Sequence, residues 1–361
     1  MESKAIRYDN LTVSSSPHLV TSLDTTKTML YVVAALMPAA LMSIVYFGIP
    51  ALVMILLCMV SCVFFEWIYE RLLGKASTVR DGSALVTGLI LALNLPANLT
   101  NLGGIEYPVF MPYLICIIGS FVAIVVVKQI FGGLGRNFAN PAIVARITLL
   151  VSFTSYMSTW PTTRFQRAGI EIMTGATPLA NLAEGNMTYA PSLRDIFLGN
   201  IGGAMGETCA LAILIGAIFL IAMKIISPII PVSFVGTVFV FSLLYYAISG
   251  TTPEGLSPLY MACFHVFAGG VMFGAVFCAT DYVTSPIMPL GKLMFGIGCG
   301  LVTMIIRLFC SYPEGVSFAI LFMNIMTPHF DEFAQDRLYG ISKRKKKQLQ
   351  RQKRRKHKEG M

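Results

Sequence analysis

The residues most able to carry chemistry gather in one polar stretch near the middle of the chain. Thr174–Leu179, with the sequence Thr-Gly-Ala-Thr-Pro-Leu, places two hydroxyl groups among small residues. Such a run is most often an ordinary loop. Its position adds weight, because five apolar segments can be drawn before it and five after it, which leaves it in the one sizeable loop outside them. This stretch is therefore the first candidate site.

A second candidate is the glycine-rich run Gly132–Asn137, which leads to Asn140 and Pro141. A tight turn between two helices explains it as well as a ligand pocket does. In a pocket, glycines would let a ligand approach the backbone, and the amides of Asn137 and Asn140 would donate and accept hydrogen bonds. Both interpretations stay open from the sequence.

Charged side chains in or beside apolar segments are costly and usually functional. Asp81 and Asp281 lie at segment ends, where capping a helix is the favoured role and a place on an ion path is the alternative. Glu66 and Lys128 lie close enough to segment ends for their side chains to reach water. Arg307 is deeper and needs a partner, which the sequence does not identify.

No pattern indicates a metal site or a catalytic residue. The eight cysteines are scattered through apolar segments without a CxxC pair, and none of the four histidines has metal-ligand neighbours in the sequence. His265 lies on an apolar run, where a packing role is more common than ligation. We therefore expect no metal or iron–sulfur centre from this chain alone.

Several stretches together resemble a known family. The Thr-Gly-Ala-Thr motif is similar to the site at which a flavin transferase attaches FMN. The chain resembles the membrane proteins that include the D subunit of the Rnf complex (ferredoxin:NAD oxidoreductase) and, more distantly, the B subunit of the sodium-pumping NADH:quinone reductase. The resemblance runs from about residue 28 to about residue 330 and is also carried by Arg80–Gly88 with Asn94–Pro96, by Gly132–Asn137 with Asn140–Ala142, and by Ala279–Pro286.

The resemblance implies a covalent flavin at Thr177, held by a phosphoester between its hydroxyl and the FMN phosphate, and hence a phosphoprotein. Thr177 then needs an exposed hydroxyl, for which Gly175 and Ala176 leave room. Pro178 would keep the backbone from folding over the site, and Thr174 would serve as a local turn or cap residue. Where the family leads us to expect an aspartate shortly before the motif, this chain has Glu171.

A second, non-covalent flavin is also implied, because the related sodium-pumping protein holds a riboflavin in its membrane part. The resemblance suggests the pocket at Asn137 and Asn140, or one near it. The implied partners are the other Rnf subunits, the flavin transferase and membrane lipid.

Composition requires a membrane protein. Mean hydropathy is +0.71, and only 12% of the 361 residues are charged, about half the share in soluble domains. With roughly 20 apolar residues per crossing, there is room for about ten helices. The expected spans are 29–47, 51–73, 82–95, 109–131, 139–157, 207–226, 230–249, 262–279, 291–310 and 315–328.

The distribution of Lys and Arg predicts the orientation. Basic residues occur near alternate span ends, whereas the loops 96–108, 250–261 and 311–314 contain none. Both termini are therefore expected in the cytoplasm of a bacterial inner membrane, and the Thr177 loop on the outer face. Most of the net charge of +9 comes from residues 343–358, which we interpret as a cytoplasmic tail near anionic lipid and not as a nucleic-acid binder.

The chain divides into five expected regions. These are an N-terminal segment (1–28), a first membrane repeat (29–157), the flavin loop (158–206), a second membrane repeat (207–330) and a basic tail (331–361). Each repeat has five spans, an odd number, so the two would be inverted relative to one another, with some helices short or broken, as in many transport folds. Asp81 and Asp281, and Asn140-Pro141 with Asn324 to Pro328, are faint echoes between the halves.

The expected function is that of a flavin-carrying membrane subunit of a redox-driven ion pump. It would take part in electron transfer from reduced ferredoxin to NAD⁺, coupled to export of Na⁺ or H⁺, and would not be catalytic alone. No dinucleotide-binding fingerprint is present. The alternative is an inverted-repeat channel or transporter without a redox cofactor, in which Thr177 would be unmodified.

Overall fold

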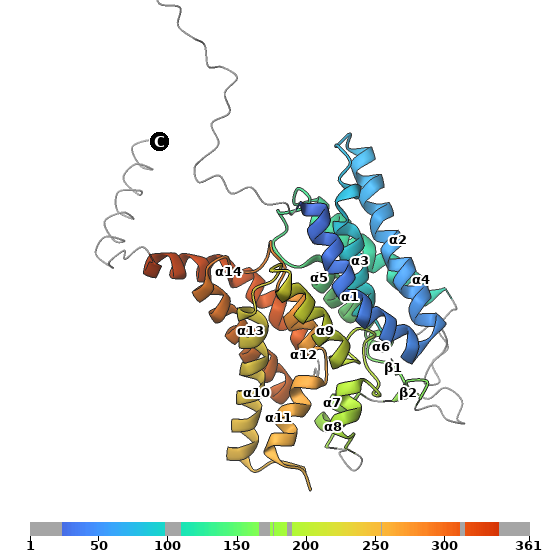
Figure 1. The fold of residues 1–361 in the computed structure, drawn as a ribbon. Coiled ribbons are helices and arrows are strands. Elements are labelled where there is room, and N and C mark those ends of the chain that lie inside the picture. The colour runs from blue at the N-terminus through green and yellow to red at the C-terminus, as the bar shows by residue number, and fades with distance from the viewer. Residues whose placement is uncertain are drawn as a thin grey trace, which may run out of the picture.

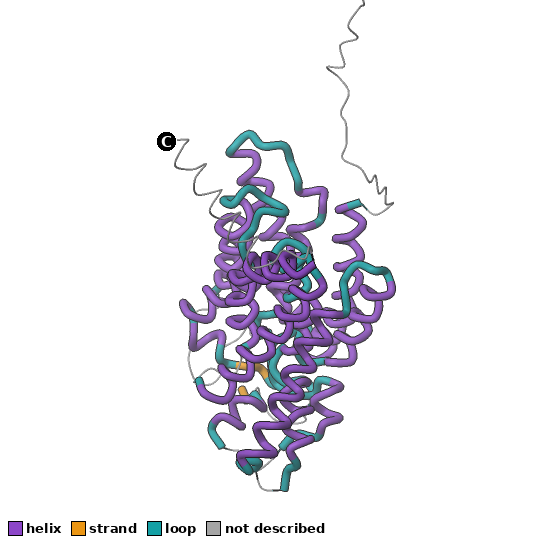
Figure 2. Tube along the Cα trace, turned by 90° about the vertical axis from the view of Figure 1, so that its left-hand side faces the viewer, coloured by secondary structure: helices purple, strands orange, loops and turns teal. Residues whose placement is uncertain are grey.

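A computed structural model describes residues 24–97, 110–165, 174–175, 177–185, 190–253, 255–310 and 315–338. Long helices run roughly along one axis, with the first half of the chain (blue to green) beside the second (yellow to red) in Figure 1. Figure 2 shows helix throughout, apart from loops and one short pair of strands. We call the end of the bundle where α1 begins the upper end, and the opposite end, where α7 and α8 lie, the lower end.

Within the described residues, five helices are long and apolar enough to cross a membrane. Their sequences combine length, few charges and good helix formers, which is what a lipid environment requires of a backbone that must satisfy its own hydrogen bonds. They are α1 (Thr25–Phe47), α2 (Ile49–Leu72), α4 (Met111–Phe121) continued by the π-helical η2 (Val122–Gln129), α10 (Ile229–Ser249) and α13 (Pro289–Phe309).

A sixth crossing is formed only if a bent pair is counted as one span. α11 (Pro258–Phe267) is followed, after a 56° bend, by α12 (Val271–Phe273) and the π-helical η3 (Gly274–Cys278). The bend falls at Ala268–Gly270, where the two glycines have positive φ of 73° and 72°, a conformation that costs glycine little.

The described part of the chain has three further apolar helices, each shorter than a membrane crossing. They are α3 (Ser83–Leu93), α5 (Pro141–Ser152) and α9 (Ala210–Ala222). The last helix, α14 (Val316–Leu338), continues across Pro328, ten residues beyond the span expected to end there. The structure therefore confirms a polytopic helical membrane protein, while ten complete spans are not confirmed.

The remaining elements are small and connect the longer helices. They are the 3-10 turn η1 (Val79–Asp81), α6 (Thr154–Met157), the strands β1 (Trp160–Pro161) and β2 (Thr174–Gly175), α7 (Pro178–Ala183) and α8 (Leu193–Leu198). β1 and β2 pair in antiparallel fashion, Trp160 with Gly175 and Pro161 with Thr174.

The two halves meet where small residues allow close approach. α1 packs against α9, and α5 against α14. A Cβ added at Gly216 of α9 would lie 2.3 Å from the carbonyl oxygen of Ala35 in α1. Small residues at helix crossings are typical of membrane bundles, where packing and not water exclusion drives association.

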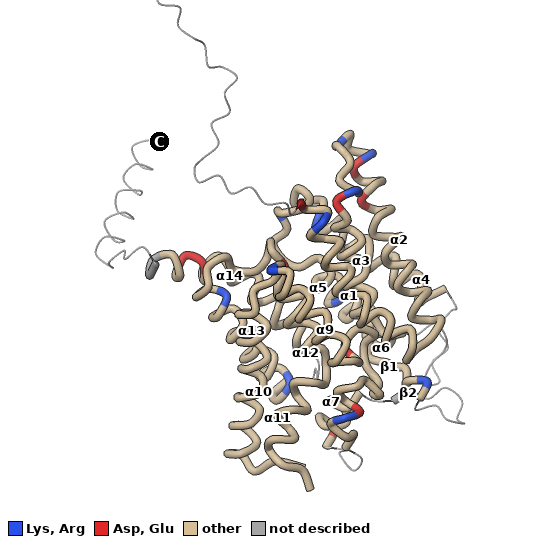
Figure 3. Tube along the Cα trace, in the orientation of Figure 1, with Lys and Arg blue, Asp and Glu red and all other residues tan. Residues whose placement is uncertain are grey.

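The outer faces of the long helices remain apolar. Leu41 on α1, Val60 on α2, Val232 on α10 and Phe309 on α13 are 55%, 65%, 68% and 67% exposed. Charged residues concentrate toward the upper end of the first half, with few along the middle of the long helices (Figure 3). This distribution fits a chain surrounded by lipid or by other membrane proteins.

Candidate functional site

The Thr177 motif lies at the lower end of the bundle, at the start of α7 (Figure 1). Thr177 is the N-cap residue of this short helix, and its Oγ1 accepts a hydrogen bond from the Ala180 amide at 3.1 Å. Pro178 occupies the first helical position, where its missing N–H leaves nothing unpaired. Leu179 anchors the helix in a small apolar cluster with Ile196 and other residues of the lower end.

The expected exposure of the Thr177 hydroxyl is wrong for this conformation. The residue is only 5% exposed, because the same hydroxyl caps α7 and the helix is docked through Leu179. The local signal was present in the sequence, since Thr followed by Pro is typical of a helix start. Thr174 and Gly175 form β2, not a cap, while Ala176 and Glu171 lie outside the described residues.

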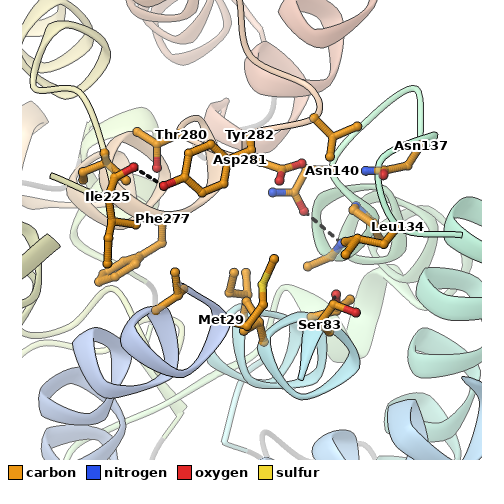
Figure 4. A pocket seen from close by; sticks show the side chains of 18 of the residues that line it. Met29, Ser83, Leu134, Asn137, Asn140, Ile225, Phe277, Thr280, Asp281 and Tyr282 are labelled. Carbon is orange, nitrogen blue, oxygen red and sulfur yellow. Dashed lines mark hydrogen bonds between the residues drawn. The ribbon is translucent and has the colours of Figure 1, made fainter. Parts of the chain in front are cut away.

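A second site lies toward the upper end, between the two halves. Side chains of α1 and α3 face those of the segments around Asn140 and Asp281 across a cavity of about 90 Å³, space for several water molecules (Figure 4). Its lining comprises Met29, Val32, Ser83, Val86, Thr87, Ile90, Lys128, Leu134, Asn137, Asn140, Pro141, Ala142, Leu220, Ile225, Ile226, Val276, Phe277, Thr280, Asp281, Tyr282 and Val283. We call this the inter-repeat pocket, because its lining comes from both of the repeats that the sequence predicts.

Three stretches that carry the family resemblance converge on this pocket. Residues within Arg80–Gly88, Gly132–Ala142 and Ala279–Pro286 all contribute to its lining, although they are far apart in the sequence. Asn137 and Asn140 both line this cavity, and a flavin as its occupant stays a prediction. Ser83 and Tyr282 were not singled out individually, but the stretches that contain them were.

Asn140 joins the two halves. Its Oδ1 accepts from the amides of Ala142 and Ile143 at 3.0 and 3.4 Å, which caps α5, and its Nδ2 donates to the Cys278 carbonyl at 3.0 Å. When the side-chain amide of Asn324 is oriented so that its oxygen and its nitrogen are both hydrogen-bonded, the Asn324 oxygen accepts from the backbone N–H of Asn140 at 3.2 Å. Oδ1 of Asn140 already accepts twice, but among the described residues only one of the two Nδ2 hydrogens has an acceptor, so the other is left for a ligand.

Asn137 is less occupied. Its Nδ2 donates to the Ala139 carbonyl at 3.2 Å, and the residue is 8% exposed. Within the described part of the chain, its Oδ1 makes no hydrogen bond, so it can accept one from a ligand. The two asparagines together thus offer both a donor and an acceptor at the pocket wall.

Asp81 lies just before the start of α3, whereas Asp281 lies at the start of a turn and precedes no helix directly. Asp81 Oδ1 accepts from the amide and hydroxyl of Ser83, at 2.8 and 2.5 Å, at the start of α3. Asp281 Oδ2 accepts from the Thr284 hydroxyl at 3.0 Å. Asp281 also lines the pocket, and burial raises the pKa of its carboxyl, with the hydrogen bond to Thr284 opposing this shift. A role for either residue on an ion path stays a prediction.

A buried ion pair borders the pocket. Lys128 Nζ lies 2.7 Å from Glu66 Oε1 and 2.6 Å from Ser83 Oγ, and Gln129 Nε2 donates to the same Glu66 oxygen at 2.9 Å. Lys128 and Glu66 are 2% and 0% exposed. The expectation that both side chains reach water is therefore wrong, because each has the other as its partner. Their separation of 62 positions left no signal in the sequence.

Arg307 finds partners on the main chain. Its guanidinium donates to the carbonyls of His265, Ala268 and Gly269, at 2.6, 3.0 and 2.7 Å. These carbonyls end the broken helix α11, where a cation is favoured by the helix dipole. His265 packs beside it, with Nε2 3.2 Å from the Tyr246 hydroxyl. Among the described residues, no group of His, Cys, Asp and Glu could hold a metal ion.

Comparison with known proteins identifies close relatives. The chain is 43% identical over 342 residues to the D subunit of the Na(+)-translocating ferredoxin:NAD(+) oxidoreductase complex of Acetobacterium woodii, covering 93% of this chain and 98% of that protein. It is 38% identical over 348 residues to the proton-translocating counterpart of Clostridium ljungdahlii, with 94% and 99% covered. It is 36% identical over 347 residues to the D subunit of the ion-translocating oxidoreductase complex of Stutzerimonas stutzeri, with 88% and 93% covered.

The sequence also matches one protein family over residues 12–340. This range includes both the Thr177 motif and every residue of the inter-repeat pocket. The chain belongs to the NQR2, RnfD, RnfE family.

Proposed function

We propose that this chain is the D subunit of an Rnf-type complex, which passes electrons from reduced ferredoxin to NAD⁺ and couples their transfer to ion export. The observation that carries this proposal is the 43% identity to such a subunit over nearly the full length of both chains. The chain would act within the complex and not alone. Relatives named for Na⁺ and for protons are similar to it in comparable degree, so the ion is Na⁺ or H⁺.

The chain would carry an FMN linked through its phosphate to Thr177. The Thr-Gly-Ala-Thr sequence supports this assignment, with Thr177 at the end of the motif. Docking of α7 leaves Thr177 as a residue only 5% exposed, and the hydroxyl is engaged in the cap. Esterification by a flavin transferase therefore requires α7 to undock or to form after attachment. A bound flavin supplies one- and two-electron redox chemistry, and the protein positions its ring.

The inter-repeat pocket would hold a second, non-covalent flavin such as riboflavin. Its donor set fits the polar edge of an isoalloxazine ring, since Asn137 offers an acceptor and Asn140 a donor. Apolar side chains such as Met29, Val86 and Phe277 provide the walls for the ring faces. At about 90 Å³ the cavity is small for three fused rings, so flexible side chains such as Met29 and Leu134 must move to admit it.

The membrane arrangement proposed is ten crossing segments in two inverted repeats of five. The third segment of each half contains a short helix, α3 or α11, and an arginine binds near the carboxyl end of that helix. Arg146 donates to Asn94 Oδ1 at 2.8 Å after α3, and Arg307 binds the end of α11. In a bacterial inner membrane, the upper end would face the cytoplasm with both termini, and the Thr177 loop the outer side, in contact with lipid and other subunits.

In-gel flavin fluorescence tests the covalent site. The denatured chain, produced with an active flavin transferase, is expected to fluoresce, and Thr177→Ala to abolish the signal. Thr154→Ala, at an exposed threonine of α6 outside the motif, serves as the matched control and should keep a fluorescent band. A dark native band, with the transferase active on another target, would remove the covalent site and favour the alternative, an inverted-repeat transporter without a redox cofactor.

A further inference from the structure

Lys128 places a charged group in the wall of the inter-repeat pocket. It belongs to the last turn of η2, and its side chain contacts Glu66 of α2 and Ser83 of α3. Ser83 and Lys128 line the cavity, whereas Glu66 does not. The positive charge of the pair therefore faces the cavity, and the negative charge lies behind it.

Packing alone does not explain such a pair. Removing two charges from water costs several kcal/mol per ion, and apolar residues of similar volume are often as stable or more so. The pair is also incompletely satisfied, because Glu66 Oε2 is buried and has no hydrogen-bond partner among the described residues. Ionisable groups within a membrane segment indicate function by default.

The ammonium has bonding capacity left for a ligand. An ammonium group has three N–H donors, and Lys128 directs hydrogen bonds to Glu66 and Ser83. Within the described residues, the third donor has no protein acceptor. Glu66 itself is fixed by Gln129, at 2.9 Å, and by the Thr78 hydroxyl, at 3.3 Å. Glu66 thus holds the lysine in place without lining the cavity.

The backbone at this point is also unusual. η2 is π-helical from Val122 to Gln129, and η3, which contributes Val276 and Phe277 to the opposite side of the pocket, is π-helical as well. π-helical turns are rare in proteins as a whole, and those that occur often lie at functional sites. Two such segments therefore border one cavity.

We propose that Lys128 is a contact residue for the electron-accepting ring in this pocket and favours its reduced form, with Glu66 as its positioning residue. This inference rests on the proposed second flavin. Adding one electron to a neutral ring adds one negative charge, and the electron comes from the ferredoxin oxidised by the complex. The ammonium keeps its proton and stabilises the added charge by Coulomb attraction and a hydrogen bond.

The midpoint potential of the pocket flavin measures this effect directly. The full chain is purified as Thr177→Ala, so that only non-covalent flavin contributes, and its acid-extractable flavin is quantified before spectroelectrochemical titration. Lys128→Met is expected to weaken binding of the reduced ring relative to the oxidised ring by at least about tenfold, which lowers the midpoint by about 59 mV for one electron. Glu66→Gln is expected to raise the midpoint, because it removes a negative charge.

Two further variants separate charge from structure. Lys128→Arg keeps the charge and should restore the midpoint toward the native value. Lys75→Met, on an exposed lysine beyond the end of α2, is the matched control and should leave it unchanged. If Lys128→Met does not fold because Glu66 is left unpaired, Lys128→Met with Glu66→Met removes both charges and should still lower the midpoint, by less.

The outcomes distinguish this inference from the function on which it rests. If Lys128→Met binds flavin with an unchanged midpoint potential, the role of Lys128 is overturned and the second flavin stands. If Lys128→Met does not fold, the same result in the double variant has the same meaning. No extractable flavin in the Thr177→Ala protein would overturn the second flavin itself, and the role of Lys128 with it. A lowered midpoint that Lys128→Arg restores would support both.

Discussion

Arg307 is expected to stabilise the bundle by holding the end of a broken helix. Arg307→Met keeps most of the side-chain volume but removes at least three hydrogen bonds, those to the carbonyls of His265, Ala268 and Gly269. At about 0.6 kcal/mol for an average hydrogen bond within a membrane protein, the loss is about 2 kcal/mol. At about 1.5 kcal/mol for a bond from a charged donor, it is about 4.5 kcal/mol. We expect a destabilisation between these limits.

The assay is reversible unfolding of the purified chain by SDS in mixed micelles, followed by circular dichroism. Arg194→Met is the matched control, because Arg194 is an exposed arginine of α8, and its loss should change stability by no more than about 0.5 kcal/mol. Arg307→Lys retains a charge but cannot bind three carbonyls in the same fork, so it should lie between the two. Native-like stability of Arg307→Met would refute the claim that this arginine supports α11.

Three other perturbations follow from the contacts. Gly216→Ala places a methyl group 2.3 Å from the Ala35 carbonyl oxygen and should lower the free energy of unfolding by about 1–3 kcal/mol in the same assay. Gly236→Ala is the control, because Gly236 has open space around it, and it should not lower the free energy of unfolding. Equal effects of the two substitutions would contradict this packing. Without flavin transferase, Thr177→Ala should lose about 1 kcal/mol of capping energy while Thr177→Ser loses less; identical stability of all three chains would argue against the cap. Because burial raises the folded-state pKa of Asp281 above 3.8, the folded state binds this proton more tightly than the unfolded state does, so stability should fall as pH rises from about 4 through the raised pKa. Asp281→Asn should remove that part of the pH dependence, and an unaltered profile would count against a buried carboxyl.

The membrane segments could be predicted because their signal is local. A long apolar run specifies a crossing helix whatever surrounds it, and the expected 29–47 and 291–310 closely match α1 and α13. The length of the last helix was not predicted, since Pro328 is usually a helix boundary in water. In α14 the helix continues across it to Leu338.

The candidate sites were predictable only in part, for a different reason. The resemblance stretches identified segments that meet at the inter-repeat pocket, but not which side chains bind one another. The Glu66–Lys128 pair depends on how α2 packs against η2, and the Arg307 contacts depend on a bend 38 to 42 residues away in the chain. Contacts between residues so far apart in the chain produce no periodic pattern in the sequence. The capping role of Thr177 was readable from its neighbour Pro178 and was missed.

The docked state of α7 makes the order of events in biogenesis a structural question. If FMN is attached at Thr177, the transferase needs the hydroxyl before Leu179 and its neighbours close the lower cluster, or must wait for that cluster to reopen. Modification and the last step of folding then compete for the same oxygen atom. A chain that completes folding too early would enter the complex without its flavin, so the rate at which this one short helix docks would limit how much of the assembled enzyme can carry electrons.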